Sequence, residues 1–595
     1  MSGEEWFSTD FSKGIGRVCK NAWVQSFVDA DEYYADLRKE VEQTAAGDII
    51  CWIGFDAGGD TPMPVQPNDE EEKSCPPRAP GTGDKTWFDL LKEADDRGVN
   101  CRVLLNLHPS PKPADKYKRA NFDLVTKLNT LKHCCAINDS RYLYLNGTHH
   151  QKLVLVYNAR KGLVAYSGTC DVEAGRILQK WCEVQCKIMG DAAAELYNVF
   201  HLRYKEHTQV FARIGSANAY LKPVEQLKTT APQSGNFLVQ VSTTYGNPGR
   251  SNPFYPLLPR FSCPIRQVVH GPHRVELSSE SISVLTSPHV YTMFGNDFFM
   301  EKEAGAKQLI EEGLKQGETY TFAPNGHTGI YHMVKQALET TKKFIYMEDQ
   351  YLVCDGRMGS LDSMLALLVN KVKQEGFKKL ILFCTRIDDI NDEFQGTAWQ
   401  HRNNFISQLV AAAPGKVEIC QYKTKGAVGC SGNDWSSIFY IHSKTWIFDD
   451  ELLITGSANC NRRGYSHDSE CDIAIYDQEK MFVKDLRTRI WKRRLNVKGI
   501  SRSPLLDRDL DDFLSACRYW EDPDRFGMAI ENSKQVPFRP TKYPDMDAAT
   551  YAAKITSDPA APALANDPGK PFIKSFIERQ KMDALWNLVV DPDGC

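Results

Sequence analysis

Two short stretches of the same kind, almost three hundred residues apart, constrain this chain more than any other feature. They are His150-Gln151-Lys152 and His442-Ser443-Lys444, and each stands at the head of an apolar run. Residues two apart lie on one face of a β-strand, so each run would carry its His and Lys on the same side. A lone His-x-Lys is a weak signal in 595 residues, and the residues after each pair give it weight.

Each pair opens a predicted β-hairpin. Residues 152–157 turn through 158–162 into 163–167, and residues 444–448 turn through Asp449 and Asp450 into 452–455. A turn of polar residues or Gly between two apolar runs is typical of a hairpin. We expect the first turn to be about four residues longer than the second, from the same hairpin rules. Both second strands then end in a short small-polar stretch, residues 168–171 and 456–459.

The order of elements around the two pairs repeats, which predicts an internal duplication. Each half reads as strand, helix, strand, hairpin, small-polar turn, strand with a Glu, and helix. The predicted fold class is α/β, with two sandwich halves of mixed sheet and flanking helices, related by a pseudo-twofold axis around one interfacial active site. The predicted domains are a lead segment (1–44), a first half (45–208), an irregular connection that partly lines a cleft (209–320), a second half (321–497) and a C-terminal wrapping extension (498–595).

Hydrophobic periodicity places the main elements. Strands are expected at 47–56, 101–107, 183–189, 239–243, 344–352, 380–384 and 472–476. Helices are expected at 87–97, 191–205, 329–340, 361–374, 480–495, 510–519 and 572–588, with another that begins near His401. The basic run Lys492-Arg493-Arg494 ends one of these helices, where cations are favourable, and is interpreted as a solvated face.

Composition narrows the choice of partner and compartment. The formal net charge is −4, which gives no global attraction for nucleic acid. No window reaches the 18 apolar residues of a membrane span, and the start of the chain lacks the features of a secretory signal. The 18 Cys include no Cys-x-x-Cys pair and are interpreted as buried, reduced thiols. We therefore expect a cytoplasmic or peripheral membrane protein, with export independent of a signal peptide left open.

The residue types suit cleavage of a phosphodiester without a metal or cofactor. Such a reaction needs a nucleophile, a proton donor for the leaving alkoxide, and cations at the non-bridging oxygens. His150 and His442 can supply the first two, and Lys152 and Lys444 the charge. The Thr169 and Ser457 hydroxyls and the Asn459 amide are candidate phosphate ligands. Glu183 and Glu470 follow their turns at equivalent places, and we expect them to hold the second nitrogen of each imidazole.

The second motif, His442-x-Lys444 with Asp449 and then Gly456-Ser457 and Asn459, resembles the HKD signature of the phospholipase D superfamily. The resemblance covers roughly residues 45–495 and implies Asp449 as a motif residue, His150 as the nucleophile and His442 as the acid. Glu348-Asp349-Gln350-Tyr351 is similar to a stretch of phospholipase members, which adds Gln350 as a substrate-site candidate.

The first motif departs from the family pattern. Tyr157 stands where the motif Asp is expected, and Asp171 stands where the second half has Asn459. A carboxylate there would repel phosphate unless a neighbouring cation binds it, and first halves of eukaryotic-type phospholipases similarly carry Asp. Gly464 stands where the pattern usually has Ser. None of these changes removes a His or a Lys.

The resemblance implies hydrolysis of a glycerophospholipid such as phosphatidylcholine or phosphatidylethanolamine to phosphatidic acid and a head group, through a phosphohistidine and with alcohol exchange as a further outcome. The substrate would be met at a membrane surface, by peripheral contact. A phosphodiesterase on nucleic acid and a non-catalytic scaffold are the alternatives. Because both motifs are in one chain, a homo-oligomer is not required. His149 is interpreted as flanking, and His327 as a helix-start residue near the cleft.

Overall fold

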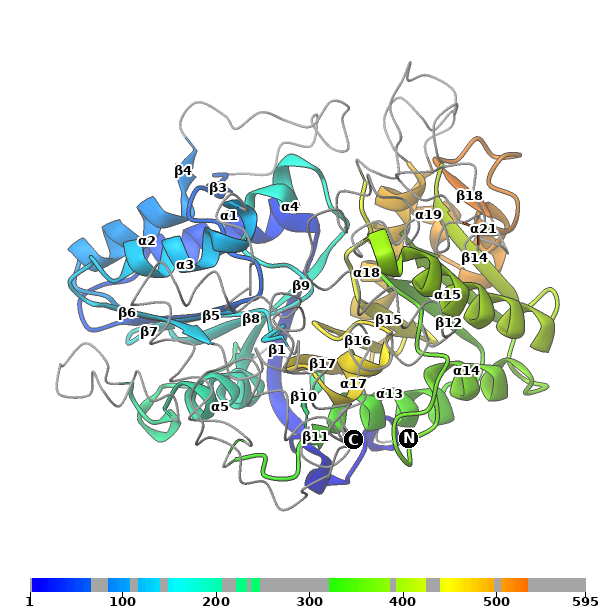
Figure 1. Cartoon of the computed structure of the whole chain (residues 1–595), viewed down its shortest axis with the longest axis horizontal. Helices are drawn as coiled ribbons and strands as arrows, with labels where there is room; N and C mark the ends of the chain where they lie inside the picture. The colour runs from blue at the N-terminus through cyan, green and yellow to red at the C-terminus, as the bar shows by residue number, and fades with distance from the viewer. Residues whose placement is uncertain are drawn as a thin grey trace, which may run out of the picture.

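The computed structural model describes residues 3–65, 84–106, 116–139, 148–205, 221–232, 237–246, 320, 322–385, 392–423, 439–496, 505–532 and 550. Within them one twisted sheet runs through the molecule and helices cover both of its faces (Figure 1). Most of the predicted connection 209–320 and the predicted helix 572–588 lie outside the described residues.

The first half contributes seven strands, of which three are parallel and the rest antiparallel. From the outer edge inward they are β6 (Cys134–Asp139), β5 (Asn100–Asn106), β2 (Ile49–Gly54), β7 (Leu153–Asn158), β8 (Gly162–Gly168), β9 (Val184–Gly190) and β1 (Cys19–Val28). The antiparallel hairpin β7–β8 thus lies between a parallel outer part and the strand pair at the centre of the sheet.

The second half repeats this order and these directions. Its strands are β14 (Val417–Tyr422), β13 (Lys379–Cys384), β12 (Phe344–Asp349), β15 (Thr445–Phe448), β16 (Leu452–Gly456), β17 (Glu470–Asp477) and β10 (Phe237–Tyr245). Strands β1 and β10 pair antiparallel, which joins the halves into one 16-stranded sheet that also includes β18 (Ile530–Asn532) beside β14 and β11 (His327–Thr328) beside β10. The pseudo-twofold axis therefore passes between β1 and β10, and the predicted α/β fold with duplicated halves is confirmed.

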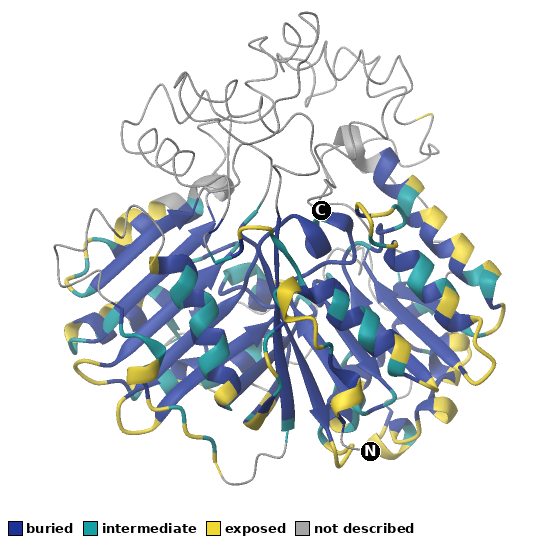
Figure 2. Ribbon diagram, turned by 90° about the horizontal axis from the view of Figure 1, so that it is seen from below, coloured by how far each residue is buried: buried dark blue, intermediate teal, exposed yellow. Residues whose placement is uncertain are grey.

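Helices cover the two halves in the arrangement that this axis requires (Figure 1). The first half has α1 (Asp29–Glu42), α2 (Trp87–Asp96) and α3 (Lys116–Leu128) on one face and α5 (Asp191–Lys205) on the other. The second half has α13 (Gly329–Thr340), α14 (Met364–Val372) and α15 (Asp392–Ala412) on one face and α18 (Phe482–Leu495) on the other. The strands between them are buried almost throughout (Figure 2), because a sheet covered on both faces must be apolar on both.

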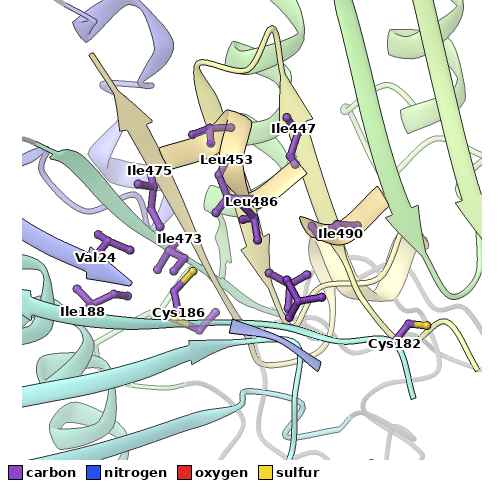
Figure 3. Close-up of a cluster of buried hydrophobic side chains, with 14 of the residues drawn as sticks. Val24, Cys182, Cys186, Ile188, Ile447, Leu453, Ile473, Ile475, Leu486 and Ile490 are labelled. Carbon is purple, nitrogen blue, oxygen red and sulfur yellow. The ribbon is translucent and has the colours of Figure 1, made fainter. Parts of the chain in front are cut away.

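One hydrophobic cluster extends across both halves. In Figure 3, Val24, Cys186 and Ile188 from the first half face Ile473, Ile475, Leu453 and Leu486 from the second. All fourteen cysteines that the structure describes are buried. The two halves therefore share a core and hold their facing surfaces in a fixed relation.

The segment expected as a polar lead is part of this body. Residues 19–42 form β1 at the centre of the sheet and α1 above it, and β10 extends the strand expected at 239–243 by two residues at each end. In β1 the polar pairs Lys20-Asn21 and Gln25-Ser26 interrupt both an apolar run and a strict alternation, so its sequence carries no clear strand pattern. The domain limits proposed at residues 44 and 320 do not match these strands.

Two helices also differ from the sequence prediction. Helix α15 begins at Asp392, nine residues before the predicted start at His401. The helix predicted at 510–519 is three short helices, α19 (Asp507–Leu510), α20 (Phe513–Ala516) and α21 (Arg518–Glu521). The carboxylate of Asp512 accepts a hydrogen bond from the Ser515 amide and caps α20, which starts a new helix in place of continuing the old one.

The two hairpins that carry the motifs differ in the length of their strands, whereas their turns have the same length. Three residues separate β7 from β8, and three separate β15 from β16. The extra residues of the first hairpin lengthen its two strands to six and seven residues, against four and five in the second. The expected longer turn is therefore wrong, because the additional residues form ladder hydrogen bonds.

Candidate active site

Both His-x-Lys pairs stand immediately before the hairpin strands, β7 and β15, and all four side chains are buried. The Lys152 ammonium donates to the carbonyl oxygen of His150 at 2.9 Å, and the Lys444 ammonium donates to that of His442 at 2.5 Å. Each Lys thus folds back over its own His. The two motifs have the same local geometry, as the duplication requires.

The chain around each His is bound to the opposite half by backbone hydrogen bonds. The His150 amide donates to the Ser469 carbonyl at 2.9 Å, and the Ser469 amide donates to Thr148 at 3.0 Å. On the other side, the His442 amide donates to the Cys182 carbonyl at 3.1 Å, and the Cys182 amide donates to Tyr440 at 2.8 Å. Ser469 and Cys182 directly precede the two candidate glutamates. Each His is therefore placed beside the Glu of the other half.

The His–Glu contacts cross the interface between the halves. Nδ1 of His150 lies 3.0 Å from both carboxylate oxygens of Glu470, and Nδ1 of His442 lies 2.8 Å from Oε1 of Glu183. A carboxylate at Nδ1 accepts a hydrogen bond from the N–H there. The proton stays on Nδ1, and Nε2 is left as the reactive nitrogen. Two imidazoles with this arrangement can act on one phosphodiester, one as the nucleophile at phosphorus and the other as the acid at the leaving oxygen.

Burial and cations set the electrostatics of both imidazoles. Burial lowers the pKa of His150 and of His442 well below the ordinary value, and Lys152 and Lys444 lower both further. His150 itself also lowers the pKa of His442. Because each group acts on the others, the two imidazoles and two ammonium groups form a single site. Imidazoles with such a low pKa are neutral and nucleophilic at neutral pH.

The comparisons with known proteins agree with this site. Residues 334–493 match the family described as "Cardiolipin synthase, PLD-like domain". The chain is 33% identical over 211 residues to phospholipase D B of Dictyostelium discoideum, which is 29% of this chain and 17% of that protein. It is 38% identical over 86 residues to phospholipase D2 of Bos taurus, which is 14% of this chain and 8% of that protein. Residues 334–493 thus form a phospholipase D-like domain.

The similarities to this superfamily are distant and partial. The matched segments span about a fifth or less of the curated relatives' own lengths. The chain is also similar to a phosphatidylserine synthase of Haemophilus influenzae, with 9% identity, 95% coverage of both chains and a TM-score of 0.46. NucT of Helicobacter pylori is similar over 27% of this chain and 86% of its own, with 13% identity and a TM-score of 0.20.

The two motif lysines have different acceptors. The Lys152 ammonium lies 3.2 Å from Oδ2 of Asp171, and the Lys444 ammonium lies 3.1 Å from Oε1 of Gln350. Asp171 thus has the neighbouring cation that a carboxylate at this position needs. Burial, with help from Lys152, lowers the pKa of Lys444 to about 7. A phosphate between the lysines would restore the favourable charge balance.

The hydroxyls expected to bind phosphate contact the glutamates. Thr169 accepts a hydrogen bond from the Val184 amide at 3.0 Å and donates its own proton to Glu183. Ser457 accepts from the Cys471 amide at 3.0 Å. Burial raises the pKa of Glu470 well above its ordinary value, and a hydrogen bond with Ser457 opposes that rise. A phosphate contact of Thr169 and Ser457 stays a prediction. Asn459 is buried, and its Oδ1 accepts no hydrogen bond within the part of the chain that the structure describes.

Asp449 lies outside the site. It is at the opposite end of β15 from His442, with φ of 54°, and its carboxylate accepts hydrogen bonds from the amides of residues 342, 343 and 344 at 2.7–2.9 Å. Its place among the catalytic residues is wrong, and it is a turn residue. The first half makes the same link in reverse. The Asp48 carboxylate, next to β2, accepts a hydrogen bond from the Ala159 amide in the turn at 2.9 Å. The first hairpin is therefore anchored to β2 even though Tyr157 replaces the motif Asp.

The structure adds residues that the sequence pattern did not place in the site. Arg176, on the short helix α4 (Ala174–Leu178), lies 3.6 Å from Glu183 and stacks on Trp181 at 3.9 Å. The Trp181 ring is 5.4 Å from His442, and the Phe55 ring is 4.8 Å from His150. The only signal for Arg176 was its place in the first-half turn, after Gly175.

Residues around the site complete its frame. His149 is buried behind it, with Nε2 3.2 Å from Oε1 of Gln151, which fits a flanking role. His327 is in β11 (His327–Thr328), where Nδ1 lies 2.9 Å from the Thr243 hydroxyl. Among the described residues, no group of three or more His, Cys, Asp or Glu could hold a metal. In the same part of the chain, no helix is long and apolar enough to cross a membrane.

Proposed function

We propose that the protein is a phosphodiesterase that hydrolyses glycerophospholipids to phosphatidic acid and a free head group. The observation that supports this most directly is the pair of crossed contacts, His150 with Glu470 and His442 with Glu183. Two imidazoles held at Nδ1, with two buried ammonium groups beside them, match the needs of phosphodiester cleavage through a covalent intermediate.

The first step would form a phosphohistidine. By analogy with the superfamily, His150 is the nucleophile: the lone pair on its Nε2 attacks phosphorus, an N–P bond forms, and the bond from phosphorus to the head-group oxygen breaks. His442, protonated at both nitrogens, gives its Nε2 proton to the leaving alkoxide. The negative phosphodiester offsets the lysines that lower the pKa of His442, so substrate binding itself favours the protonated acid.

The second step would release phosphatidic acid. Neutral His442 takes a proton from water, the water oxygen attacks phosphorus, and the N–P bond breaks to restore both imidazoles. An alcohol in place of water gives head-group exchange by the same route. Lys152 and Lys444 stabilise the charge on the non-bridging oxygens in both steps, which is the type of contribution that preorganised cations make in a buried site.

The test offers two kinds of substrate to one protein. Liposomes of phosphatidylcholine, phosphatidylethanolamine and phosphatidylserine, and single-stranded DNA in a parallel assay, are incubated in EDTA with the wild type, His150→Ala and His442→Ala. His133→Ala is the control, since His133 accepts at its backbone oxygen from Cys101 and lies outside the site. We expect head-group release by the wild type and the control, and a loss of about 10²-fold or more in each site variant.

Other outcomes would reject the proposal. Head-group release that survives both substitutions would contradict the mechanism. Cleavage of DNA without lipid turnover would select the nucleic-acid phosphodiesterase, and turnover of neither would favour a scaffold. Rapid denaturation of the wild type during turnover at mildly alkaline pH, where the N–P bond survives, followed by mass spectrometry, would locate the phosphatidyl group on His150 or on His442 and so order the two roles.

A further inference from the structure

The basic run at the end of α18, expected from the sequence to be a solvated face, is only partly exposed: Lys492 is exposed, whereas Arg494 is buried between the two halves. Arg494 is fully buried, with Nε 2.8 Å from Oε1 of Glu348 and Nη1 3.0 Å from Oδ1 of Asp29. Arg493 lies 3.2 Å from Asp31 and 2.6 Å from Glu32. A buried cation with two carboxylates in direct contact is costly to desolvate, so an ion pair here needs a reason beyond general stability.

Asp29 connects this ion pair to the site. Its Oδ1 accepts the Glu183 amide at 3.0 Å, and its own amide donates to the Glu183 carbonyl at 3.0 Å. Asp29 therefore holds both backbone polar groups of the residue whose carboxylate binds His442. The chain of contacts runs from Arg494 through Asp29 and Glu183 to His442. Arg494 and His442 belong to the second half, and Asp29 and Glu183 belong to the first.

The backbone of Asp29 is in an uncommon conformation. Its φ is 69°, a left-handed value that few residues other than Gly adopt, at the junction where β1 ends and α1 begins. Such a conformation costs free energy and persists only where surrounding contacts require it. The contacts that require it here are the two hydrogen bonds to Glu183 and the ion pair with Arg494.

The second half has a neutral residue at the equivalent place. Glu470 pairs in the sheet with Thr244 of β10, at the position that matches Asp29 beside Glu183. The His150–Glu470 contact is thus supported by a neutral neighbour, and the His442–Glu183 contact by a buried ion pair. This difference between two otherwise duplicated halves coincides with the difference in role that the two imidazoles need.

We propose that Asp29, held by Arg494, is a positioning residue that fixes Glu183 and thereby orients His442 for proton transfer. The inference rests on the proposed function for its kinetic part only. Asp29 touches neither substrate nor imidazole, so its removal should affect the step that uses His442 and leave the environment of His150 unchanged. The groups that face His442 are Glu183, Arg176, Lys444, Lys152 and His150.

The experiment compares Asp29→Ala with Asp29→Asn. Alanine removes the acceptor for the Glu183 amide, whereas asparagine keeps an acceptor oxygen and tolerates the left-handed backbone. We expect kcat to fall about 10²-fold in Asp29→Ala with KM changed much less, because a small misplacement of a reacting group costs that much. Asparagine should recover most of the loss. Asp31→Asn is the control. Asp31 lies on α1, as Asp29 does, but it pairs with Arg493 of α18 and does not contact Glu183.

A spectroscopic measurement separates this inference from the substrate question. Nitrogen-15 spectra of labelled histidine report which ring nitrogen carries the proton, with or without turnover. We expect His442 to be protonated at Nδ1 in the wild type and in both Asn variants, and to show a mixture of tautomers in Asp29→Ala, with His150 unchanged in all. A folded Asp29→Ala protein with wild-type His442 tautomer, or with equal changes at both histidines, would overturn the proposal even if no lipid is a substrate.

Discussion

His150 and Glu470 are 320 residues apart in sequence, yet Nδ1 of the imidazole lies 3.0 Å from both carboxylate oxygens. The pair belongs to both halves at once, and so does its counterpart, His442 with Glu183. Each motif His thus takes its carboxylate from the opposite half. The active site is therefore a property of the interface, and the shared hydrophobic cluster that fixes this interface also fixes the catalytic geometry.

Replacement of either glutamate by glutamine should impair catalysis without unfolding the protein. The amide keeps the size of the side chain but can present an N–H to Nδ1, which favours the wrong tautomer of the imidazole. We expect kcat to fall by about 10²-fold or more in Glu183→Gln and in Glu470→Gln. Steady-state kinetics on the liposome substrate measure this. Glu195→Gln, at an exposed ion pair with Arg17, should be indistinguishable from the wild type, and full activity in a site variant would contradict the assignment.

The pH dependence of kcat/KM should be bell-shaped with a maximum near neutrality. Burial raises the pKa of Glu183 to about 7, so this acceptor is ionised only above that pH, and burial lowers the pKa of Lys444 to about 7, so this cation is protonated only below it. Activity therefore falls on both sides. In Lys444→Arg the cation stays charged, and the alkaline limb should move up by at least about one pH unit. An alkaline limb that does not move would show that another group causes it.

The sequence predicted the parts of the fold that depend on local pattern. Helices α5 and α13 have the predicted bounds, and the two hairpins follow their His-x-Lys pairs as expected. Strand β1 was missed because pairs of polar residues interrupt both an apolar run and a strict alternation, and its role appears only through its partners β9 and β10. Its neighbour β10 was expected at 239–243, but pairing between segments hundreds of residues apart leaves no local signal, so the junction of the two halves at β1 and β10 could not be predicted.

The residues of the candidate site also divide into those that a local sequence pattern predicted and those that depend on how the two halves pack. Both pairs and both glutamates could be found in the sequence because the duplication marks equivalent positions. Which Glu serves which His could not, because the crossing depends on how the halves face each other. Asp29 gave no signal, since its effect depends on a left-handed backbone and a buried Arg494 from the other half. Asp449 lies in the predicted turn, and the motif spacing does not distinguish a turn residue from a reacting one.

The corrected role of Asp449 predicts a loss of stability without a loss of chemistry. In Asp449→Asn an NH2 group replaces one of the two oxygens that accept backbone amides at the start of β12, while asparagine tolerates the positive φ. We expect the free energy of unfolding to fall by about 1–3 kcal/mol. Asp48→Asn should do the same in the first half, where Asp48 binds the amides of residues 45 and 159.

Urea denaturation followed by circular dichroism measures both changes, and kcat of the folded fraction is measured alongside. The surface variant Asp362→Asn, in a loose ion pair at 3.8 Å with Arg357, is the control for the loss of one carboxylate. A fall in kcat of Asp449→Asn beyond about tenfold, with the fold intact, would return Asp449 to the catalytic residues.

The segment 505–532 should be integral to the second half and not a detachable cover. Trp520 of α21 is fully buried, with ring centroids 5.3 Å from Trp491, 5.3 Å from Phe383 and 5.5 Å from Tyr346. Trp520→Ala should lower the free energy of unfolding by about 3–5 kcal/mol, from lost burial and the cavity left behind. Trp520→Phe keeps an aromatic ring and removes an indole N–H that has no acceptor in the described structure, so it should cost much less.

Leu514→Ala, at a side chain 46% exposed, is the control. If Trp520→Ala costs no more than Leu514→Ala, the segment is a cover that the core does not need. If it costs the full amount, the segment is part of the core, because the Trp520 ring packs against Trp491 of α18, the helix that carries Arg494.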